Sequence, residues 1–241
     1  MSVGDSRWGL VIVAAGSGTR YGDPLKALAT LGERPLITWS LHRLGAHPQV
    51  QHVVVVCAPH SHDALSTLLE QADINGVDTC LGGATRAESV QAGIAALRAD
   101  ITHVAVHDAA RPFASRELFS RLMQAAERIG AAIPARAVTD TVHVADDAGQ
   151  IVGLLERSHL RAAQTPQLAR RDWLTIALER SGQVQSPSDE AAALVAAGYP
   201  VELVEGELTN LKITWPGDLA MAGQWLRDGL IALDAQEQED E

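Results

Sequence analysis

Three short runs of apolar, mostly β-branched residues constrain the fold of this chain more than any other feature. They are WGLVIVA (8–14), HVVVVCA (52–58) and HVAVH (103–107), and none of them alternates with polar residues. Such runs suit strands of a parallel sheet that is covered on both faces. Because helical patterns lie between them, the sequence predicts right-handed βαβ units in a doubly wound, mostly parallel α/β sheet.

Two helices are predicted from their caps and apolar spacing. Residues 85–99 open with a Thr85–Glu88 capping box, and residues 115–130 repeat apolar positions on one face before Gly130 stops them. Further helical patterns occupy 170–181, 188–198 and 216–230. Because neither a repeat nor a linker interrupts the pattern, we expect one domain over 1–241.

The region 137–157 interrupts this rhythm of strands and helices. TVHVADDAGQIVGLL (141–155) has the pattern of a β-hairpin, with DDAG (146–149) at its turn. A hairpin inserted into an α/β domain is often a protruding arm, and exposed strands seek partners. The sequence therefore predicts a dimerisation arm, with a surface flap packed on its own domain as the alternative.

Composition narrows the class of protein. The net charge is −11, and five acids lie in the terminal stretch 234–241, which we expect to form a frayed tail. This balance disfavours nucleic acid as a partner. No signal peptide or apolar run of membrane-spanning length is visible, and Cys57 and Cys80 lack metal-type spacing. We expect a cytoplasmic protein with reduced thiols and, at 241 residues, no fused downstream enzyme domain.

The loops after the predicted strands carry the chemistry. In an open α/β sheet, ligands bind outside the carboxyl ends of the strands. The first loop, in AAGSGTRYGDPLKA (14–27), is neither a P-loop nor a dinucleotide turn, because no GK pair follows and Tyr21 replaces the third glycine. A tight turn explains Gly16 and Gly18. It does not explain Arg20 and Lys26, which together with the loop amides predict an anion clamp.

Two further segments are less specific by themselves. In HDAARP (107–112), Asp108 could coordinate Mg²⁺ or accept from a ribose hydroxyl, and Arg111 could pair with Asp108 or with a substrate phosphate. A capped turn with a surface arginine explains the same residues, and both interpretations stay open. In GGATRAES (82–89), the capping box alone accounts for the residue types, so Arg86 is expected on the surface or in a structural ion pair.

Nucleophilic hydrolysis finds little support. The nine histidines are scattered, and neither a G-x-S-x-G elbow nor a helical histidine pair at metal spacing occurs. His60, His62, His103 and His107 are expected at strand ends or on the surface. Cations, glycine amides and one or two carboxylates suit phosphoryl or nucleotidyl transfer, where positioning and charge neutralisation dominate catalysis.

Assembled in order, the segments resemble the 2-C-methyl-D-erythritol 4-phosphate cytidylyltransferases of the non-mevalonate isoprenoid pathway. The blocks are AAGSGTR, LGGATRAESV, VHDAARP, TDTV, LLERSHLRAAQTPQ, SDEAAALVAAG and VEGELTNLKIT, of which HDAARP and QTPQ are the most specific. The resemblance implies a Rossmann-like sheet of the nucleotide-diphospho-sugar transferase type and a homodimer joined through the arm. It also implies Mg²⁺-dependent transfer of CMP from CTP to methylerythritol phosphate, giving 4-diphosphocytidyl-2-C-methyl-D-erythritol and pyrophosphate.

The same resemblance implies roles for individual residues. The catalytic group would be Arg20, Lys26, Arg157 and Lys212. The nucleotide would be bound by Ala14, Ala15, Gly16, Gly18, Gly83, Ser89 and Asp108, with Asp108 as the metal ligand and the metal held mainly by the CTP phosphates. The sugar phosphate would be bound by Arg111, Thr141, Arg157 and Lys212, with the arm residues acting in the neighbouring subunit's site.

Two departures from the family pattern bear on this site. Leu25 separates Pro24 from Lys26, so the reach of the lysine has to be established, and Ala84 follows Gly83 where a polar residue is common.

Two alternative functions remain. One is a cytidylyltransferase for another polyol phosphate such as ribitol 5-phosphate, and the other is a non-catalytic nucleotide sensor. A phosphate monoester is already an anionic nucleophile at neutral pH, so no strong general base is needed.

Overall fold

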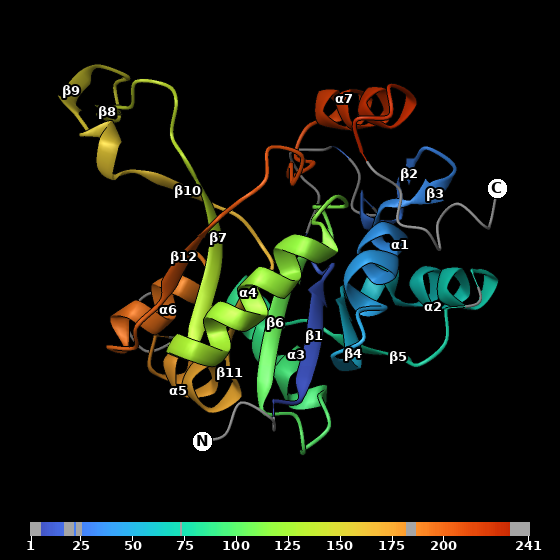
Figure 1. Ribbon diagram of the computed structural model, residues 1–241. Helices are drawn as coiled ribbons and strands as arrows, with labels where there is room; N and C mark the ends of the chain where they lie inside the picture. Colours follow the sequence, from blue (N-terminus) through green and yellow to red (C-terminus); the bar gives the residue numbers. More distant parts are fainter. Residues whose placement is uncertain (1–5, 17–21, 23–25, 73, 182–186, 232–241) are drawn as a thin grey trace.

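A computed structural model describes residues 6–16, 22, 26–72, 74–181 and 187–231. Its centre is a mixed sheet with helices on both faces (Figure 1). The strands run in the order β10-β7-β11-β6-β1-β4-β5, and β12 also pairs with β7. Their bounds are β1 (Trp8–Val13), β4 (Val50–Cys57), β5 (Val77–Leu81), β6 (His103–Asp108), β7 (Ala131–Ala137), β10 (Arg161–Ala163), β11 (Gln167–Arg170) and β12 (Glu202–Glu205).

The topology confirms the predicted doubly wound sheet. Strands β1, β4, β5 and β6 are parallel, and β11 runs antiparallel between β6 and β7. The chain moves from β1 outward to β4 and β5, then returns to place β6 on the other side of β1. The strand order thus reverses at β1 and β6, where Val13 lies opposite Asp108. A ligand site is expected at this edge of the sheet.

Apolar runs form the inner strands because both faces of the sheet are covered. Leu10 and Ile12 pack into one core, and Val11 between them packs into the other. Helices α1, α2 and α4 cover the first face, and α3, α5 and α6 cover the second. The helices are α1 (Leu36–Ser40), α2 (His62–Gln71), α3 (Arg86–Ala96), α4 (Arg116–Ile129), α5 (Arg171–Ser181), α6 (Glu190–Ala196) and α7 (Pro216–Arg227).

Besides these layers, the structure contains a third apolar cluster and several short helices and strands. A third apolar cluster lies beneath α7 and includes Leu31, Trp39 and Phe113. The short elements are η1 (Lys26–Leu28), β2 (Thr30–Leu31), β3 (Arg34–Pro35), the π-helical η2 (Leu41–Gly45), η3 (Pro59–Ser61) and η4 (Arg157–His159). No helix in the described ranges is long and apolar enough to cross a membrane.

Both predicted helix caps are confirmed. The Thr85 hydroxyl accepts a hydrogen bond from the Glu88 amide at 3.1 Å, and the Glu88 carboxylate accepts one from the Thr85 amide at 3.1 Å. Gly130 ends α4 at φ 107°, and a Cβ there would overlap the Trp173 ring. Glycine is therefore required at this position for both its conformation and its size.

The predicted hairpin is confirmed as an arm that leaves the body of the protein (Figure 1). It consists of β8 (His143–Ala145) and β9 (Ile151–Leu154), which pair antiparallel and make a sheet of their own. In the turn, Gly149 has φ 79°, and the Asp146 carboxylate accepts from the amide of Gln150 at 2.9 Å. Ile151, Val152 and Leu154 are each more than 60% exposed. Their exposure argues against a flap packed on its own domain.

Both cysteines are free, as expected. Cys57 at the end of β4 faces one core, whereas Cys80 on β5 packs against the other. Burial raises the pKa of each thiol, so neither is activated as a thiolate. The acidic tail predicted at 234–241 lies outside the described residues.

Candidate active site

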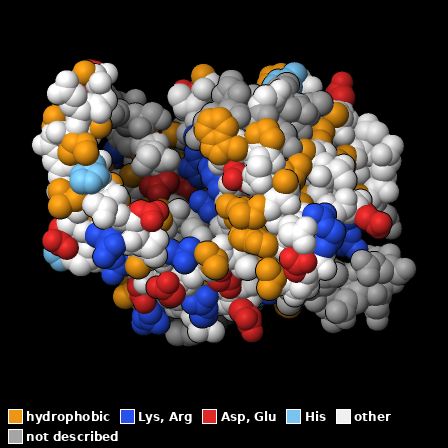
Figure 2. All heavy atoms as spheres, turned by 90° about the horizontal axis from the view of Figure 1, so that it is seen from above, with side chains coloured by type: hydrophobic (Ala, Val, Ile, Leu, Met, Phe, Trp, Pro, Cys, Tyr) orange, Lys and Arg blue, Asp and Glu red, His pale blue; other side chains and the backbone are white. Residues whose placement is uncertain are grey.

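A cavity of about 370 Å³ lies at the carboxyl ends of β1 and β6, where the strand order reverses. Figure 2 views the molecule from above this edge and shows basic side chains gathered in the hollow beside the arm. The sequence-predicted residues that line the cavity are Ala14, Ala15, Gly16, Lys26, Gly83, Ser89, Asp108 and Lys212. Gly18 and Arg20 lie outside the described residues.

Close packing shapes the wall formed by the GGATRAES segment. The Ser89 hydroxyl accepts from the Gly83 amide at 3.2 Å and donates to the Thr85 carbonyl at 2.9 Å. A Cβ on Gly83 would overlap the Glu88 side chain, so a larger residue could not take its place there. The Ala84 amide donates to the Glu88 carboxylate at 2.6 Å. The departure at Ala84 therefore leaves the main-chain geometry of the capping box intact.

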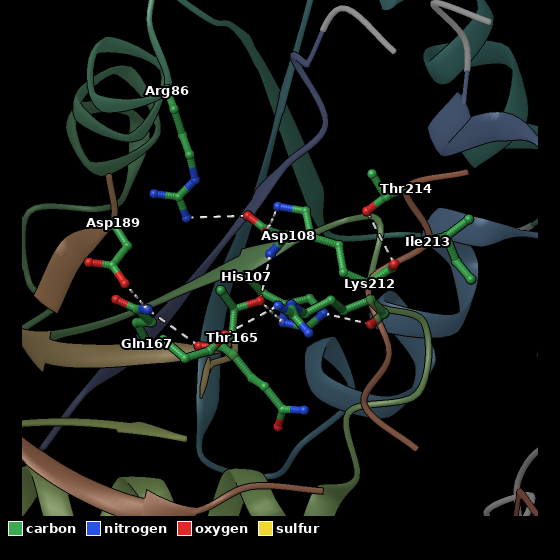
Figure 3. A network of polar contacts seen from close by, with 12 residues as sticks. Arg86, His107, Asp108, Thr165, Gln167, Asp189, Lys212, Ile213 and Thr214 are labelled. Carbon is green, nitrogen blue, oxygen red and sulfur yellow. Dashed lines mark hydrogen bonds and ion pairs between the residues drawn. The ribbon is translucent and has the colours of Figure 1, made fainter. Parts of the chain in front are cut away.

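Asp108 is the carboxylate that lines the cavity among the described residues, and two cations hold it (Figure 3). Its Oδ2 accepts from Lys212 Nζ at 2.6 Å, and its Oδ1 accepts from Arg86 Nη2 at 3.2 Å. Burial opposes its ionisation, but the charges of Arg86 and Lys212 outweigh burial and hold the pKa of Asp108 well below its ordinary value. The carboxylate is thus an anion held between two positive groups.

Arg86 forms the structural ion pair that was one of its two expected roles, and it also lines the cavity. Its Nη1 and Nη2 donate to the two carboxylate oxygens of Glu190, at 2.5 and 3.0 Å. Glu190 opens α6 and is buried. Sequence reasoning assigned no site role to either residue, because the local cap explained Arg86 and its partner is 104 positions away.

Lys26 reaches the cavity despite the leucine that precedes it. The lysine lies at the start of η1, and its Nζ donates to the main-chain carbonyl of Ile213 at 2.9 Å. Lys26 and Lys212 are the only lysines in the sequence, and both line this cavity. In a chain with a net charge of −11, the lysines are thus confined to one place.

Of the predicted sugar-phosphate residues, Lys212 lines the cavity, whereas Arg111, Thr141 and Arg157 are not among the described residues that line it. Arg111 Nη1 donates to the carbonyl of Asn210 at 2.7 Å, and burial lowers the pKa of its guanidinium. Arg157 Nη1 donates to the carbonyl of Thr139 at 2.6 Å, and the side chain of Thr141 is exposed. Arg157 and Thr141 belong to the arm and are not among the described residues that line the cavity.

A buried histidine orients the HDAARP turn. The Asp108 amide donates to the Thr165 hydroxyl at 3.0 Å. Because the carbonyl of Arg111 can only accept from His107 Nε2, Nδ1 of the neutral ring accepts from that hydroxyl at 3.1 Å. His107 Nε2 then carries the proton and donates to the carbonyl of Arg111 at 2.9 Å. Burial lowers the pKa of His107 to about 4, which keeps it neutral. It stands at the end of β6, as expected, but in the interior.

The QTPQ segment joins the loops that surround the cavity (Figure 3). The Gln164 amide donates to the carbonyl of Glu207 at 2.8 Å, in the loop that leads to Lys212. The Gln167 amide donates to the carboxylate of Asp189 at 3.0 Å, at the start of α6. The two glutamines thus connect this segment to the loop before Lys212 and to the start of α6.

The donor set fits a magnesium ion carried by a polyphosphate. No three His, Cys, Asp or Glu side chains in the described ranges lie close enough to form a metal site of their own. Asp108 offers one carboxylate at the cavity. Mg²⁺ is usually bound through one or two carboxylates together with substrate phosphates. The site is consistent with that arrangement.

Comparisons with known proteins agree with this geometry. The family model described as IspD, 2-C-methyl-D-erythritol 4-phosphate cytidylyltransferase, matches residues 9–228. The enzyme of that description from Xanthomonas oryzae pv. oryzae is 42% identical over 233 residues, which cover 93% of this chain and 84% of that protein. The bifunctional enzyme IspD/IspF of Desulfotalea psychrophila is 37% identical over 221 residues, which cover 91% of this chain.

A solved structure shows the same fold. The 2-C-methyl-D-erythritol 4-phosphate cytidylyltransferase of Thermus thermophilus matches with a TM-score of 0.75 and 34% identity, covering 90% of this chain and 98% of that one. The alignment with the Desulfotalea enzyme covers 56% of that protein. The present chain thus spans about half the length of the bifunctional relatives that it matches.

Proposed function

This chain belongs to the 2-C-methyl-D-erythritol 4-phosphate cytidylyltransferase family, and we propose from that premise that it transfers CMP from CTP to 2-C-methyl-D-erythritol 4-phosphate. The products are 4-diphosphocytidyl-2-C-methyl-D-erythritol and pyrophosphate, an isoprenoid precursor and its by-product. The observation that carries the proposal is the meeting of both lysines with Asp108 at the point where the strand order reverses.

The chemistry is a displacement between two anions. A phosphate oxygen of the sugar phosphate attacks the α-phosphorus of CTP, and a new P–O bond forms. The bond from that phosphorus to the α–β bridging oxygen breaks, and pyrophosphate leaves with the electron pair. The attacking phosphate is already ionised near neutral pH. The protein therefore has to position two anions and neutralise their charge, which is the task of the lysines.

The nucleotide is proposed to lie along the β1 loop and the GGATRAES wall. Ala14, Ala15, Gly83 and Ser89 would face the cytosine, with Asp108 toward the ribose. Lys26, with Arg20 and the amides of Gly16 and Gly18, would contact the triphosphate. Mg²⁺, held by Asp108 and the phosphates, would supply further charge neutralisation.

The sugar phosphate is proposed to be bound by Lys212 and Arg111 from one subunit and by Thr141 and Arg157 from another. Within one chain, the two arm residues are not among the described residues that line the cavity. The exposed apolar residues of β9 offer a surface for a second copy of the chain. Both features support a homodimer in which each arm completes the other subunit's site.

That the chain forms a single domain and that it is located in the cytoplasm stay predictions.

The test is a pyrophosphate assay with CTP, Mg²⁺ and methylerythritol phosphate. We expect pyrophosphate release that depends on all three components. No release would contradict the proposed function. Competition between methylerythritol phosphate and ribitol 5-phosphate at equal concentration distinguishes the acceptors, and a strong ribitol preference would replace the proposed substrate.

A further inference from the structure

A row of four alternating charges runs beside the cavity, and three of its four members line it. It runs from Glu190 on α6 through Arg86 on α3 and Asp108 on β6 to Lys212 in the loop before α7. The salt bridges measure 2.5 Å, 3.2 Å and 2.6 Å in that order. The charges of the row sum to zero, and each inner residue has an oppositely charged partner on both sides.

The two ends of the row differ in burial and in geometry. The Glu190 side chain is 2% exposed, whereas the Lys212 side chain is 39% exposed. At the buried end, the guanidinium of Arg86 donates to both oxygens of Glu190. At the open end, one ammonium on a flexible stem makes the contact. A planar fork is held more rigidly than a single ammonium group.

Both chain neighbours of Glu190 are hydrogen-bonded to the central sheet. The Gln167 side-chain amide on β11 donates to Asp189 at 3.0 Å, and its side-chain carbonyl accepts from the Ala191 amide at 2.9 Å. Asp189 also caps α6 through the amide of Ala192 at 2.8 Å. Glu190 is thus presented to Arg86 from a rigid support.

We infer that Glu190 is a positioning residue for nucleotidyl transfer, acting through Arg86 on Asp108. Because Glu190 holds the guanidinium of Arg86, Lys212 is the cation that can release Asp108 and bind a substrate phosphate instead. Asp108 stays in place on the Arg86 contact when Lys212 leaves. Without the Glu190 charge, Arg86 becomes a further mobile cation that competes with Lys212 for Asp108 or for phosphate oxygens. The inference rests on the proposed function.

The first variant is Glu190→Gln, which keeps the volume and one acceptor oxygen but removes the charge. We expect kcat to fall about 10- to 100-fold, because misplacement of reacting groups costs rate. We expect the KM for CTP to stay the same or to decrease, because the cavity gains net positive charge. A purely structural role would lower only the amount of folded enzyme, so kcat is counted per folded molecule by circular dichroism and active-site titration.

The matched control is Glu202→Gln. Glu202 accepts from Arg128 Nη2 at 2.6 and 2.8 Å on the surface, and neither residue lines the cavity. This variant removes the same kind of charge from an arginine pair, and its kcat and KM should equal those of the wild type. The inference is overturned if Glu190→Gln has wild-type kcat, or if only its KM rises.

A second variant keeps the inference testable if Glu190→Gln does not fold. Arg86→Lys retains a positive charge beside Glu190, but one ammonium cannot reproduce the fork that reaches both carboxylates. We expect the same loss of kcat, and wild-type kcat in this variant would overturn the inference. A wild-type protein that releases no pyrophosphate would instead contradict the proposed function, so the two failures are distinguishable.

Discussion

The ammonium group of Lys26 donates a hydrogen bond to the main-chain carbonyl of Ile213, 187 positions further along the chain, at 2.9 Å. Ile213 follows Lys212 directly. The loops that carry the two lysines therefore meet at the cavity, and the carbonyl sets the position of the first lysine. The residue between Pro24 and Lys26 does not turn this side chain away from the cavity.

Replacement of Lys26 by alanine should separate catalysis from binding. We expect kcat to fall roughly 10²–10³-fold, as for the loss of one charge-stabilising group, with a much smaller change in CTP affinity. Steady-state pyrophosphate release and calorimetric titration with CTP measure the two effects. Lys26→Arg is the control that keeps the charge. If CTP affinity is lost and kcat is unchanged, the role of Lys26 is binding alone.

The confinement of both lysines to one cavity allows a chemical test. A limiting amount of an amine-modifying reagent should label Lys26 and Lys212, and CTP with Mg²⁺ should slow the labelling of both, because the triphosphate covers them. Peptide mass spectrometry measures each rate, and the α-amino group serves as the internal control. Labelling rates that are the same with and without CTP would place the triphosphate elsewhere.

Much of the site could be predicted because its parts stand at strand ends. Ser89 lies in the segment after β5, Asp108 ends β6, and the β1 loop follows β1; the rule for open α/β sheets brings such strand ends together. Glu190 was missed for the opposite reason. It lies on a short helix, its partner Arg86 is 104 positions away, and the capping box already explained the residues around that arginine.

Strand β7 and the hydrogen-bond partners of Arg111 were not predicted from the sequence either. Strand β7 is rich in alanine and contains Pro134, so its composition does not resemble that of the β-branched strands.

The sequence left open whether Arg111 pairs with Asp108. In the structure its guanidinium donates to the carbonyls of Asn210 and Ala163, at 2.7 and 3.4 Å. Hydrogen bonds to main-chain carbonyls cannot be read from a sequence, because every residue carries such a carbonyl.

The arm should hold two copies of the chain together. Ile151→Asp combined with Val152→Asp places two charges among the exposed apolar residues of β9, and we expect the dimer to dissociate. Light scattering measures the mass of each species. Leu230→Asp, at an equally exposed leucine outside the arm, is the control and should stay dimeric. A monomeric wild-type protein would contradict the proposed assembly.

A mixing experiment tests whether each arm serves the other subunit. Arg157→Ala and Lys212→Ala should each be nearly inactive alone. If Arg157 acts in the neighbouring site, one of the two sites in a mixed dimer is intact, and subunit exchange should restore about a quarter of the wild-type activity. No restoration after confirmed exchange would show that Arg157 and Lys212 act in the same chain.

The neutral, buried state of His107 should make the protein sensitive to mild acid. Its Nδ1 accepts from Thr165 and its Nε2 donates to the carbonyl of Arg111, so the ring has no place for a second proton. Burial lowers its pKa to about 4, against about 6.5 in an unfolded chain. Burial also lowers the pKa of His47 and of His103.

As the pH falls below about 6.5, the unfolded imidazole takes up a proton and the folded one does not, which favours unfolding. The free energy of unfolding should thus decrease between pH 6.5 and about 4, with His107 contributing about 3 kcal/mol of that loss. Urea titrations across this range measure it. His107→Asn should be less stable at pH 7 but show a shallower decrease with acid, because one titrating group is removed. His143→Asn, on the arm, is the control for loss of an imidazole. An equally steep decrease in His107→Asn and the wild type would show that His107 is not the group responsible.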